Sequence, residues 1–321
     1  MMSAFLRAFA FALALTGGAA AAVAQPLDGG TLKIVVPYGP GGSSDRAARL
    51  LADGLAARIG VPVVVENRPG AGGRLAAQQV RHEGNSNTLI LANPAIMVVA
   101  PLVFTDVGYV PDNDFVPVSQ VTEYEFAVAV GPAVPVREFN HLLAWMRANP
   151  EKASVAVPAT GSLPHFFALM LGERTGVDVQ VVGYRGSASA LTDLIGGHVP
   201  VAVDTLDTLE PQHAGEKIRM LAVSGERRSP ASPEVPTFRE IGIDLTASGW
   251  NTLFAPVTMP ADKVRRLSEA VAETMRDEAL RERFAGASMV PVSSNAAQTA
   301  EALRAYRAQW EPVVRRSGYR P

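Results

Sequence analysis

Leu-Lys-Ile-Val-Val-Pro-Tyr-Gly-Pro-Gly-Gly-Ser-Ser-Asp, at positions 32–45, is the stretch of sequence that decides the fold. Its first residues form a short β-branched run, which is typical of a buried strand, and the glycines then break that strand. Ser43 or Ser44 provides an N-cap for a helix whose apolar residues recur at helical spacing as far as Gly60. Because another apolar run follows at 61–65, the segment predicts a β-α-β unit and therefore a parallel sheet.

The same alternation of strands and helices continues along the chain. We expect strands at 88–92, 154–157, 179–182, 199–203 and 219–223, an extended segment at 115–130, and helices at 74–82, 141–148, 164–174 and 188–195. After 252–256 only helices are predicted, at 261–276, 278–284 and 297–316. We expect these last helices to pack back on the first sheet. The chain then crosses twice between two α/β domains, and the two crossings form a hinge. The predicted limits are 25–123 with 249–321 for the first domain, and 124–248 for the second.

Residues 1–24 have the pattern of a secretory signal peptide. Arg7 precedes an apolar run at 8–15, and Ala22-Val23-Ala24 matches an A-x-A cleavage site. The apolar run is too short to span a bilayer. A lipoprotein needs a cysteine at its mature N-terminus, and the chain has no cysteine. We therefore expect export to the periplasm without a lipid anchor.

Composition and motif spacing argue against several classes of protein. The 29 Lys and Arg residues nearly balance the 31 Asp and Glu residues, which gives no support for a nucleic-acid partner. The five histidines do not have the spacing of metal ligands, so no metal site is expected. A P-loop requires a lysine beside its glycine-rich turn, and no lysine lies near the glycine-rich turns of this sequence. We expect no cofactor and no catalytic residues.

Three segments share one pattern, in which a strand is followed by a Gly/Ser turn and the start of a helix, at 38–45, 159–165 and 184–188. In a parallel sheet such turns lie at the carboxyl ends of the strands, where ligands bind. Each turn exposes unpaired backbone N–H groups and the positive end of a helix dipole. Any one of them alone is an ordinary helix cap. Together, from both domains, they predict an anion site that needs no buried counter-charge.

The mature chain also carries four longer stretches that identify a family. They are Val-Val-Pro-Tyr-Gly-Pro-Gly-Gly-Ser-Ser-Asp (35–45), Val-Val-Val-Glu-Asn-Arg-Pro-Gly-Ala-Gly-Gly (63–73), Tyr-Arg-Gly-Ser-Ala-Ser-Ala-Leu-Thr-Asp-Leu (184–194) and Arg-Ser-Pro-Ala-Ser-Pro-Glu-Val-Pro-Thr (228–237). In this order they resemble the Bug (Bordetella uptake gene) family, the substrate-binding components of tripartite tricarboxylate transporters. The resemblance implies a two-domain type II periplasmic-binding-protein fold, with a hinge and an interdomain cleft that closes around a small organic carboxylate. It also implies integral-membrane transporter subunits as partners, and we expect a monomer.

Carried over to this sequence, the resemblance implies ligand-binding residues on both lips of the cleft. One lip has Gly41, Gly42, Ser43, Ser44 and Asp45, with Tyr38 beside them, and the other has Gly161, Ser162, His165, Gly186, Ser187, Ala188 and Asp204. The chain departs from the family pattern in two places. Gly84-Asn85-Ser86-Asn87-Thr88 replaces the usual Asp-Gly-Tyr-Thr, which predicts a reshaped lip, and Arg185 replaces the usual lysine.

Several alternatives stay open at this point. Asp45 is either a ligand contact or an acid that complements the helix dipole, and His165 is either a cleft contact or a core histidine. For the whole protein, the main alternative is a sensor that presents the same carboxylate to a membrane signalling protein. An exported hydrolase would need a triad built on His165, Asp204 and a serine, although no G-x-S-x-G elbow is present. A dinucleotide enzyme would use the turn at 39–44, where Ser44 stands in place of the third glycine.

Overall fold

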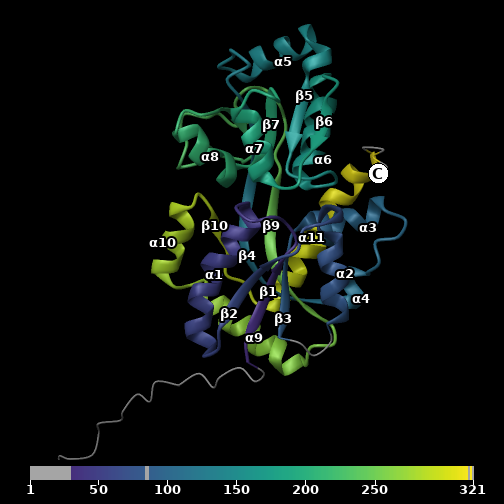
Figure 1. Cartoon of the computed structure of the whole chain (residues 1–321), viewed down its shortest axis with the longest axis vertical. Helices are drawn as coiled ribbons and strands as arrows, with labels where there is room; N and C mark the ends of the chain where they lie inside the picture. Colours follow the sequence, from purple (N-terminus) through teal and green to yellow (C-terminus); the bar gives the residue numbers. More distant parts are fainter. Residues whose placement is uncertain (1–29, 84–86, 317–318, 320–321) are drawn as a thin grey trace, which may run out of the picture.

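The protein consists of two α/β lobes that are joined by the strands β4 and β9 (Figure 1). The computed structural model describes residues 30–83, 87–316 and 319. The predicted signal peptide and residues 84–86, part of the first departure from the family pattern, lie outside the described residues. In the part of the chain that is described, no helix has both the length and the apolar character needed to cross a bilayer.

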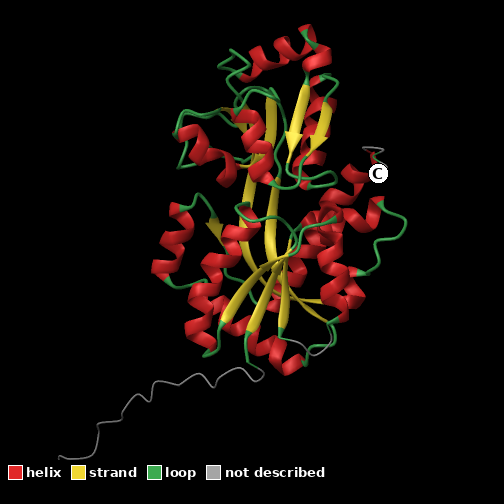
Figure 2. Cartoon of the chain, in the orientation of Figure 1, coloured by secondary structure: helices red, strands yellow, loops and turns green. Residues whose placement is uncertain are grey.

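The first lobe is built on three parallel strands, which confirms the β-α-β unit predicted from the opening stretch. Its amino-terminal elements are β1 (Leu32–Val36), α1 (Ser43–Ile59), β2 (Val63–Asn67), η1 (Ala71–Gly73), α2 (Arg74–His82), β3 (Thr88–Ala92), η2 (Ala95–Val99), α3 (Ala100–Val103), α4 (Pro111–Asp114) and the first part of β4 (Phe115–Val130). Its carboxyl-terminal elements are β9 (Ser248–Pro256), α9 (Ala261–Thr274), α10 (Glu278–Gly286), β10 (Val290–Pro291) and α11 (Ala296–Arg316). Helices cover both faces of this part of the sheet (Figure 2).

The second lobe lies between the two crossings of the chain. Its elements, after the second part of β4, are α5 (Phe139–Ala148), η3 (Pro150–Lys152), β5 (Ser154–Val157), α6 (Leu163–Thr175), β6 (Gln180–Gly183), α7 (Ser187–Ile195), β7 (Val201–Thr205), α8 (Leu206–Ala214) and β8 (Arg219–Val223). Strand β5 pairs in parallel with both β6 and β7. Helix α8 was not predicted, because Pro211 inside it breaks the helical pattern of the sequence.

The strand order along the main path is β2-β1-β3-β9-β4-β7-β5-β6, and β4 connects the two lobes. Up to Glu125, the residues of β4 pair with the antiparallel strand β9. From Phe126 onward they pair with β7, while β8 also pairs with β4. The change of partner therefore falls within a continuous strand of 16 residues, which is the expected place for a hinge.

The buried side chains follow the predicted periodicities. In α1, Ala47, Leu51 and Leu55 are fully buried, and the helix ends at Gly60, whose φ of 68° belongs to the left-handed region. In α11, the ring of Tyr306 lies 5.7 Å from the ring of Trp250 on β9. The last helix thus packs back on the first lobe, as the sequence predicts.

Candidate ligand-binding cleft

The three Gly/Ser turns surround one cavity of about 50 Å³ between the lobes. The turn after β1 contributes one side of it, and the turns after β5 and β6 contribute the other. The two sides are close together, since a Cβ atom added to Gly42 would lie 3.5 Å from Ser187 Oγ. Likewise, a Cβ atom on Gly39 would lie 3.4 Å from the carbonyl oxygen of Arg185. The structure therefore shows the lobes in a closed arrangement.

Most of the residues predicted for the site line this cavity. They are Tyr38, Gly42, Ser43, Ser44, Asp45, Ser162, Gly186, Ser187 and Asp204. Sequence reasoning missed Gly39, Asn93, Tyr124, Pro158, Pro164 and Thr205, which line it as well. Of the missed residues, Asn93 follows β3 and Tyr124 lies on β4. Neither is part of a glycine-serine turn, so the sequence carried no signal for them.

Gly41, Gly161, His165 and Ala188 are not among the residues that line the cavity. The backbone N–H of Gly161 donates a hydrogen bond of 2.8 Å to Nδ1 of His165, and His165 is buried against Phe166 and Tyr319. Burial lowers the pKa of His165 to about 4, so the ring is neutral and organises the turn. A contact between these four residues and a ligand stays a prediction.

The helices that begin at the cavity leave backbone donors available. Helix α1 begins after Gly42 and α7 begins after Gly186, and neither N-cap residue makes a side-chain capping bond. At α6, the Ser162 hydroxyl accepts a 3.4 Å hydrogen bond from the N–H of His165. Because the first N–H groups of a helix have no partner within the helix, these ends favour a negatively charged group nearby.

Asp45 is held in place by several donors from its own lobe. Its carboxylate accepts hydrogen bonds from the N–H of Gly41 at 2.9 Å and from Asn67 at 2.9 Å, and Arg49 forms an ion pair with it at 2.9 Å. Burial alone would raise the pKa of Asp45, but the hydrogen bonds from Arg49, Gly41 and Asn67 outweigh it and hold the pKa below its ordinary value. Asp45 therefore stays ionised and shapes the turn.

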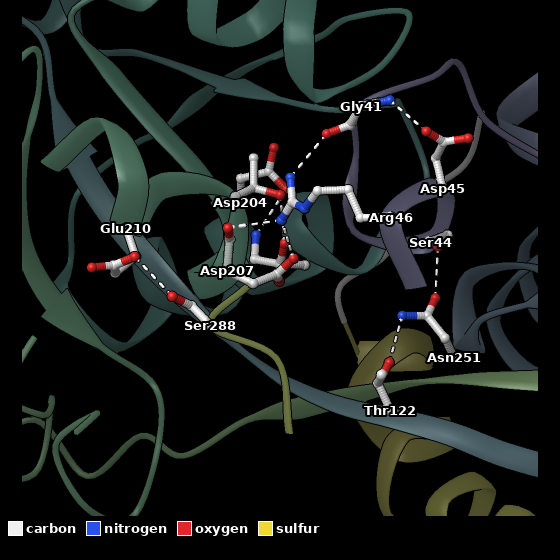
Figure 3. A network of polar contacts seen from close by, with 12 residues as sticks. Gly41, Ser44, Asp45, Arg46, Thr122, Asp204, Asp207, Glu210, Asn251 and Ser288 are labelled. Carbon is white, nitrogen blue, oxygen red and sulfur yellow. Dashed lines mark hydrogen bonds and ion pairs between the residues drawn. The ribbon is translucent and has the colours of Figure 1, made fainter. Parts of the chain in front are cut away.

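A second network joins the first turn to the strands of the hinge (Figure 3). The Ser44 hydroxyl donates a 2.6 Å hydrogen bond to Asn251 on β9, and Asn251 donates a 2.9 Å hydrogen bond to Thr122 on β4. All three residues are buried. The lip of the cavity is thus tied to both strands that connect the lobes.

The polar contacts between the lobes centre on Arg46 and Asp207 (Figure 3). Arg46 on α1 forms an ion pair with the carboxylate of Asp207 on α8, and it donates further hydrogen bonds to the carbonyl oxygens of Asp207 at 2.7 Å and Gly41 at 2.9 Å. A second contact is a 2.8 Å hydrogen bond from Ser288 to Glu210. Neither contact was predicted, because both depend on how one lobe lies against the other.

The comparison with known proteins identifies the family. The model of the tripartite tricarboxylate transporter family receptor matches residues 47–319. The chain belongs to this receptor family. A UPF0065 protein from Bordetella bronchiseptica is 31% identical over 94% of this chain and 90% of its own length. Protein BugT from Bordetella pertussis is 30% identical over 94% of each chain. The resemblance to the Bug family is thereby confirmed.

Solved structures of the tripartite tricarboxylate receptor family have the same two-lobed fold. Rpa4515 of R. palustris, determined with adipate, has a TM-score of 0.87 at 30% identity and covers 91% of this chain and 98% of its own. MatC from Rhodopseudomonas palustris, with bound malate, has a TM-score of 0.83 at 29% identity and covers 88% and 98%. The predicted periplasmic-binding-protein fold is confirmed. The family consists of periplasmic solute-binding proteins, so this receptor is not an enzyme.

In this tripartite tricarboxylate receptor, Asp204 differs from the other acids of the cleft. It is 3% exposed, its Oδ1 accepts a 2.7 Å hydrogen bond from the N–H of Thr205, and its Oδ2 has no hydrogen-bond partner among the described residues. Burial raises the pKa of Asp204 to about 7, and the charge of Asp207 acts in the same direction, while Ser187, the Thr205 N–H and Arg46 oppose them. Burial also raises the pKa of Asp207, against the effect of Arg46.

The described residues do not form a metal site with these acids. Within the described ranges, no group of three or more His, Asp or Glu side chains is arranged to hold a metal ion. The lining of the cavity contains no Lys, Arg or His side chain either. What the receptor's cleft offers to a ligand is therefore helix N-termini, hydroxyl groups, aromatic rings and the free oxygen of Asp204.

Proposed function

We propose that this protein captures a small organic carboxylate in the periplasm and delivers it to the integral-membrane subunits of a tripartite tricarboxylate-type transporter. The observation that supports this proposal is the meeting of three helix N-termini, from α1, α6 and α7, at one cavity without basic side chains. Each terminus contributes up to about 2 kcal/mol to the binding of an anion when it is partly buried. Three of them supply up to about 6 kcal/mol, and a micromolar complex requires about 8 kcal/mol.

The proposed ligand-binding residues are those predicted from the sequence that line the cavity, with Asn93, Tyr124 and Thr205 added from the structure. In this proposal, residues 25–123 with 249–321 form one domain and residues 124–248 form the other. The open form takes up the carboxylate at the helix ends, and the ligand shifts the equilibrium toward the closed form. The closed form is then the shape that the membrane subunits recognise.

The proposed location follows from the amino-terminal sequence. Residues 1–24 direct export and are then removed. The receptor then acts in the periplasm as a monomer. It has no lipid anchor, because such an anchor is attached to a cysteine and the chain has none. Size-exclusion chromatography with light scattering on protein purified from the periplasm tests the monomer. Mass spectrometry of the same sample tests the removal of residues 1–24.

A thermal-shift screen tests the proposed function. The protein is unfolded and refolded to remove any bound compound, and it is then heated with mono-, di- and tricarboxylates, with NAD, and with uncharged analogues. A true ligand at a hundred times its Kd adds about 2.7 kcal/mol to the free energy of unfolding. Native mass spectrometry of freshly purified protein provides an independent search for a co-purified acid. Stabilisation by NAD alone, turnover of an ester, or a panel of acids without any effect would overturn the proposal.

A further inference from the structure

One carboxylate in the cavity has no counter-ion among the described residues. Asp45 is paired with Arg49, and Asp207 is paired with Arg46. Asp204 is 3% exposed and lines the cavity. Its Oδ1 accepts a hydrogen bond from the N–H of Thr205, but its Oδ2 has no hydrogen-bond partner in the part of the chain that is described. Arg46 acts on Asp204 only from a distance, because it is paired with Asp207. No basic side chain is among the lining residues, so a positive charge in direct contact with Oδ2 has to come from the ligand.

A buried carboxylate without a counter-ion in contact is disfavoured in its ionised form. A protonated amine is the strongest complement for its free oxygen, because it combines opposite charge with N–H donors. A second carboxylate at the same place would be repelled, unless Asp204 first took up a proton. We infer that Asp204 is a specificity-determining residue, which selects a ligand that carries a protonated amino group beside its carboxylate.

The inference rests on the proposed function, which assigns the carboxylate of the ligand to the helix N-termini. It then assigns the amino group to Oδ2 of Asp204, at the end of β7. The cavity of about 50 Å³ holds only a small compound in the closed form, so the two groups are a few atoms apart. The ligand class is therefore a short amino carboxylate.

Proton exchange during binding provides a readout that a purely structural role of Asp204 would not change. The charged groups that act on its titration are Asp207 on α8 and Arg46 on α1, and hydrogen bonds from Ser187 and the Thr205 N–H act beside them. Tyr124 on β4 faces both acids. With its pKa at about 7, Asp204 is close to half protonated in neutral solution. An amino group that pairs with Asp204 lowers this pKa, so binding takes up no proton and releases up to about half of one. A plain carboxylate raises the pKa, so binding takes up to about half a proton from the buffer.

Isothermal titration calorimetry on the refolded full-length mature chain tests the inference. The probes are matched pairs, namely L-aspartate with succinate, L-glutamate with glutarate, and 4-aminobutyrate with butyrate. Titrations at pH 7 in phosphate and in Tris give the number of protons exchanged. We expect the amino compound to bind at least tenfold more tightly than its partner in each pair that binds, without proton uptake. Asp204→Asn should remove this preference. Asp193→Asn, on α7 with its side chain 38% exposed and outside the cavity, should retain it.

The outcomes separate the inference from the proposed function. If plain carboxylates bind as tightly as their amino partners, or if the amino compounds bind with proton uptake, the inference is wrong and the carboxylate receptor remains. A preference that survives in Asp204→Asn also overturns it. If no carboxylate binds, in these pairs or in the wider screen, the proposed function fails and the inference fails with it. The affinity ratios and proton counts of the wild-type protein decide the matter even where the variant does not fold.

Discussion

The unusual position of Asp204 makes a quantitative prediction about stability. The pKa of this buried carboxyl is raised from 3.8 to about 7, so folding takes up a proton between these values. Its contribution to the free energy of unfolding is therefore fully present below pH 3.8 and is lost as the pH rises through 7. Each pKa unit corresponds to about 1.36 kcal/mol. Between pH 5 and pH 8 the wild-type protein should lose roughly 3 kcal/mol through this one group.

Asp204→Asn removes the ionisation and keeps the shape of the side chain. The amide leaves an unpartnered NH2 group, which costs about 1–3 kcal/mol, but this cost is the same at both pH values and cancels in the comparison. The variant should thus gain roughly 3 kcal/mol on the wild type between pH 5 and pH 8. For a chain of this size the gain corresponds to roughly 5 °C in the thermal midpoint.

Differential scanning calorimetry of the ligand-free proteins at pH 5 and pH 8 measures this difference. Asp193→Asn is the control, because it removes a carboxylate from the same lobe outside the cavity. Its midpoint should follow that of the wild type at both pH values. Parallel pH dependences of the wild type and Asp204→Asn would refute the reasoning, since they would mean that water reaches Asp204 in the ligand-free protein.

Three further changes test the closed arrangement of the lobes. Arg46→Met should raise the Kd for the ligand at least tenfold and increase the radius of gyration in small-angle scattering, because Asp207 loses its partner across the cleft at a cost of about 3–5 kcal/mol. Recovery of affinity in a double variant with Asp207→Asn would support this explanation. An unchanged Kd in the single variant would contradict it. Gly42→Leu should abolish closure without lowering the thermal midpoint. Gly42→Ala should still close, because its Cβ atom would lie 3.5 Å from Ser187 Oγ, an ordinary van der Waals distance. Equal affinities of the two variants would count against the observed closeness of the lobes. Ser187→Leu should abolish ligand binding in calorimetry, because the larger side chain fills the cavity. Ser189→Leu, on the exposed side of α7, should bind the ligand normally. Binding by both variants would place the ligand elsewhere.

The sequence predicted most of the fold because the packing follows local patterns. The strands of the first lobe are β-branched runs, and α1 ends where Gly60 adopts a left-handed φ of 68°. The long strand β4 matched the extended segment predicted at 115–130. Helix α8 was the main omission, since Pro211 lies inside it and removes a backbone donor.

The candidate site could be predicted only in part, because only some of its residues belong to a local sequence pattern. The three turns share a local pattern, and strands that run in parallel bring their carboxyl ends to one edge, so their meeting at the cavity follows from the fold. The contacts that join the lobes have no such pattern. Arg46 and Asp207 are 161 positions apart, and Ser44 and Asn251 are 207 positions apart. Such pairs are set by tertiary packing, which a single sequence does not reveal.

Asp204 and Asp207 divide two tasks between neighbouring carboxylates. Asp207 pairs with Arg46 and so favours closure, whereas Asp204 keeps an oxygen free beside the cavity. In the closed form both acids are buried, and the charge of each raises the free energy of the other. A ligand that brings a positive charge to Asp204 removes this repulsion only in the closed form. Its binding free energy therefore differs between the two forms, which is the condition for a ligand to drive closure. A compound that lacks this charge gains the helix termini but leaves the repulsion in place, so it closes the receptor less completely.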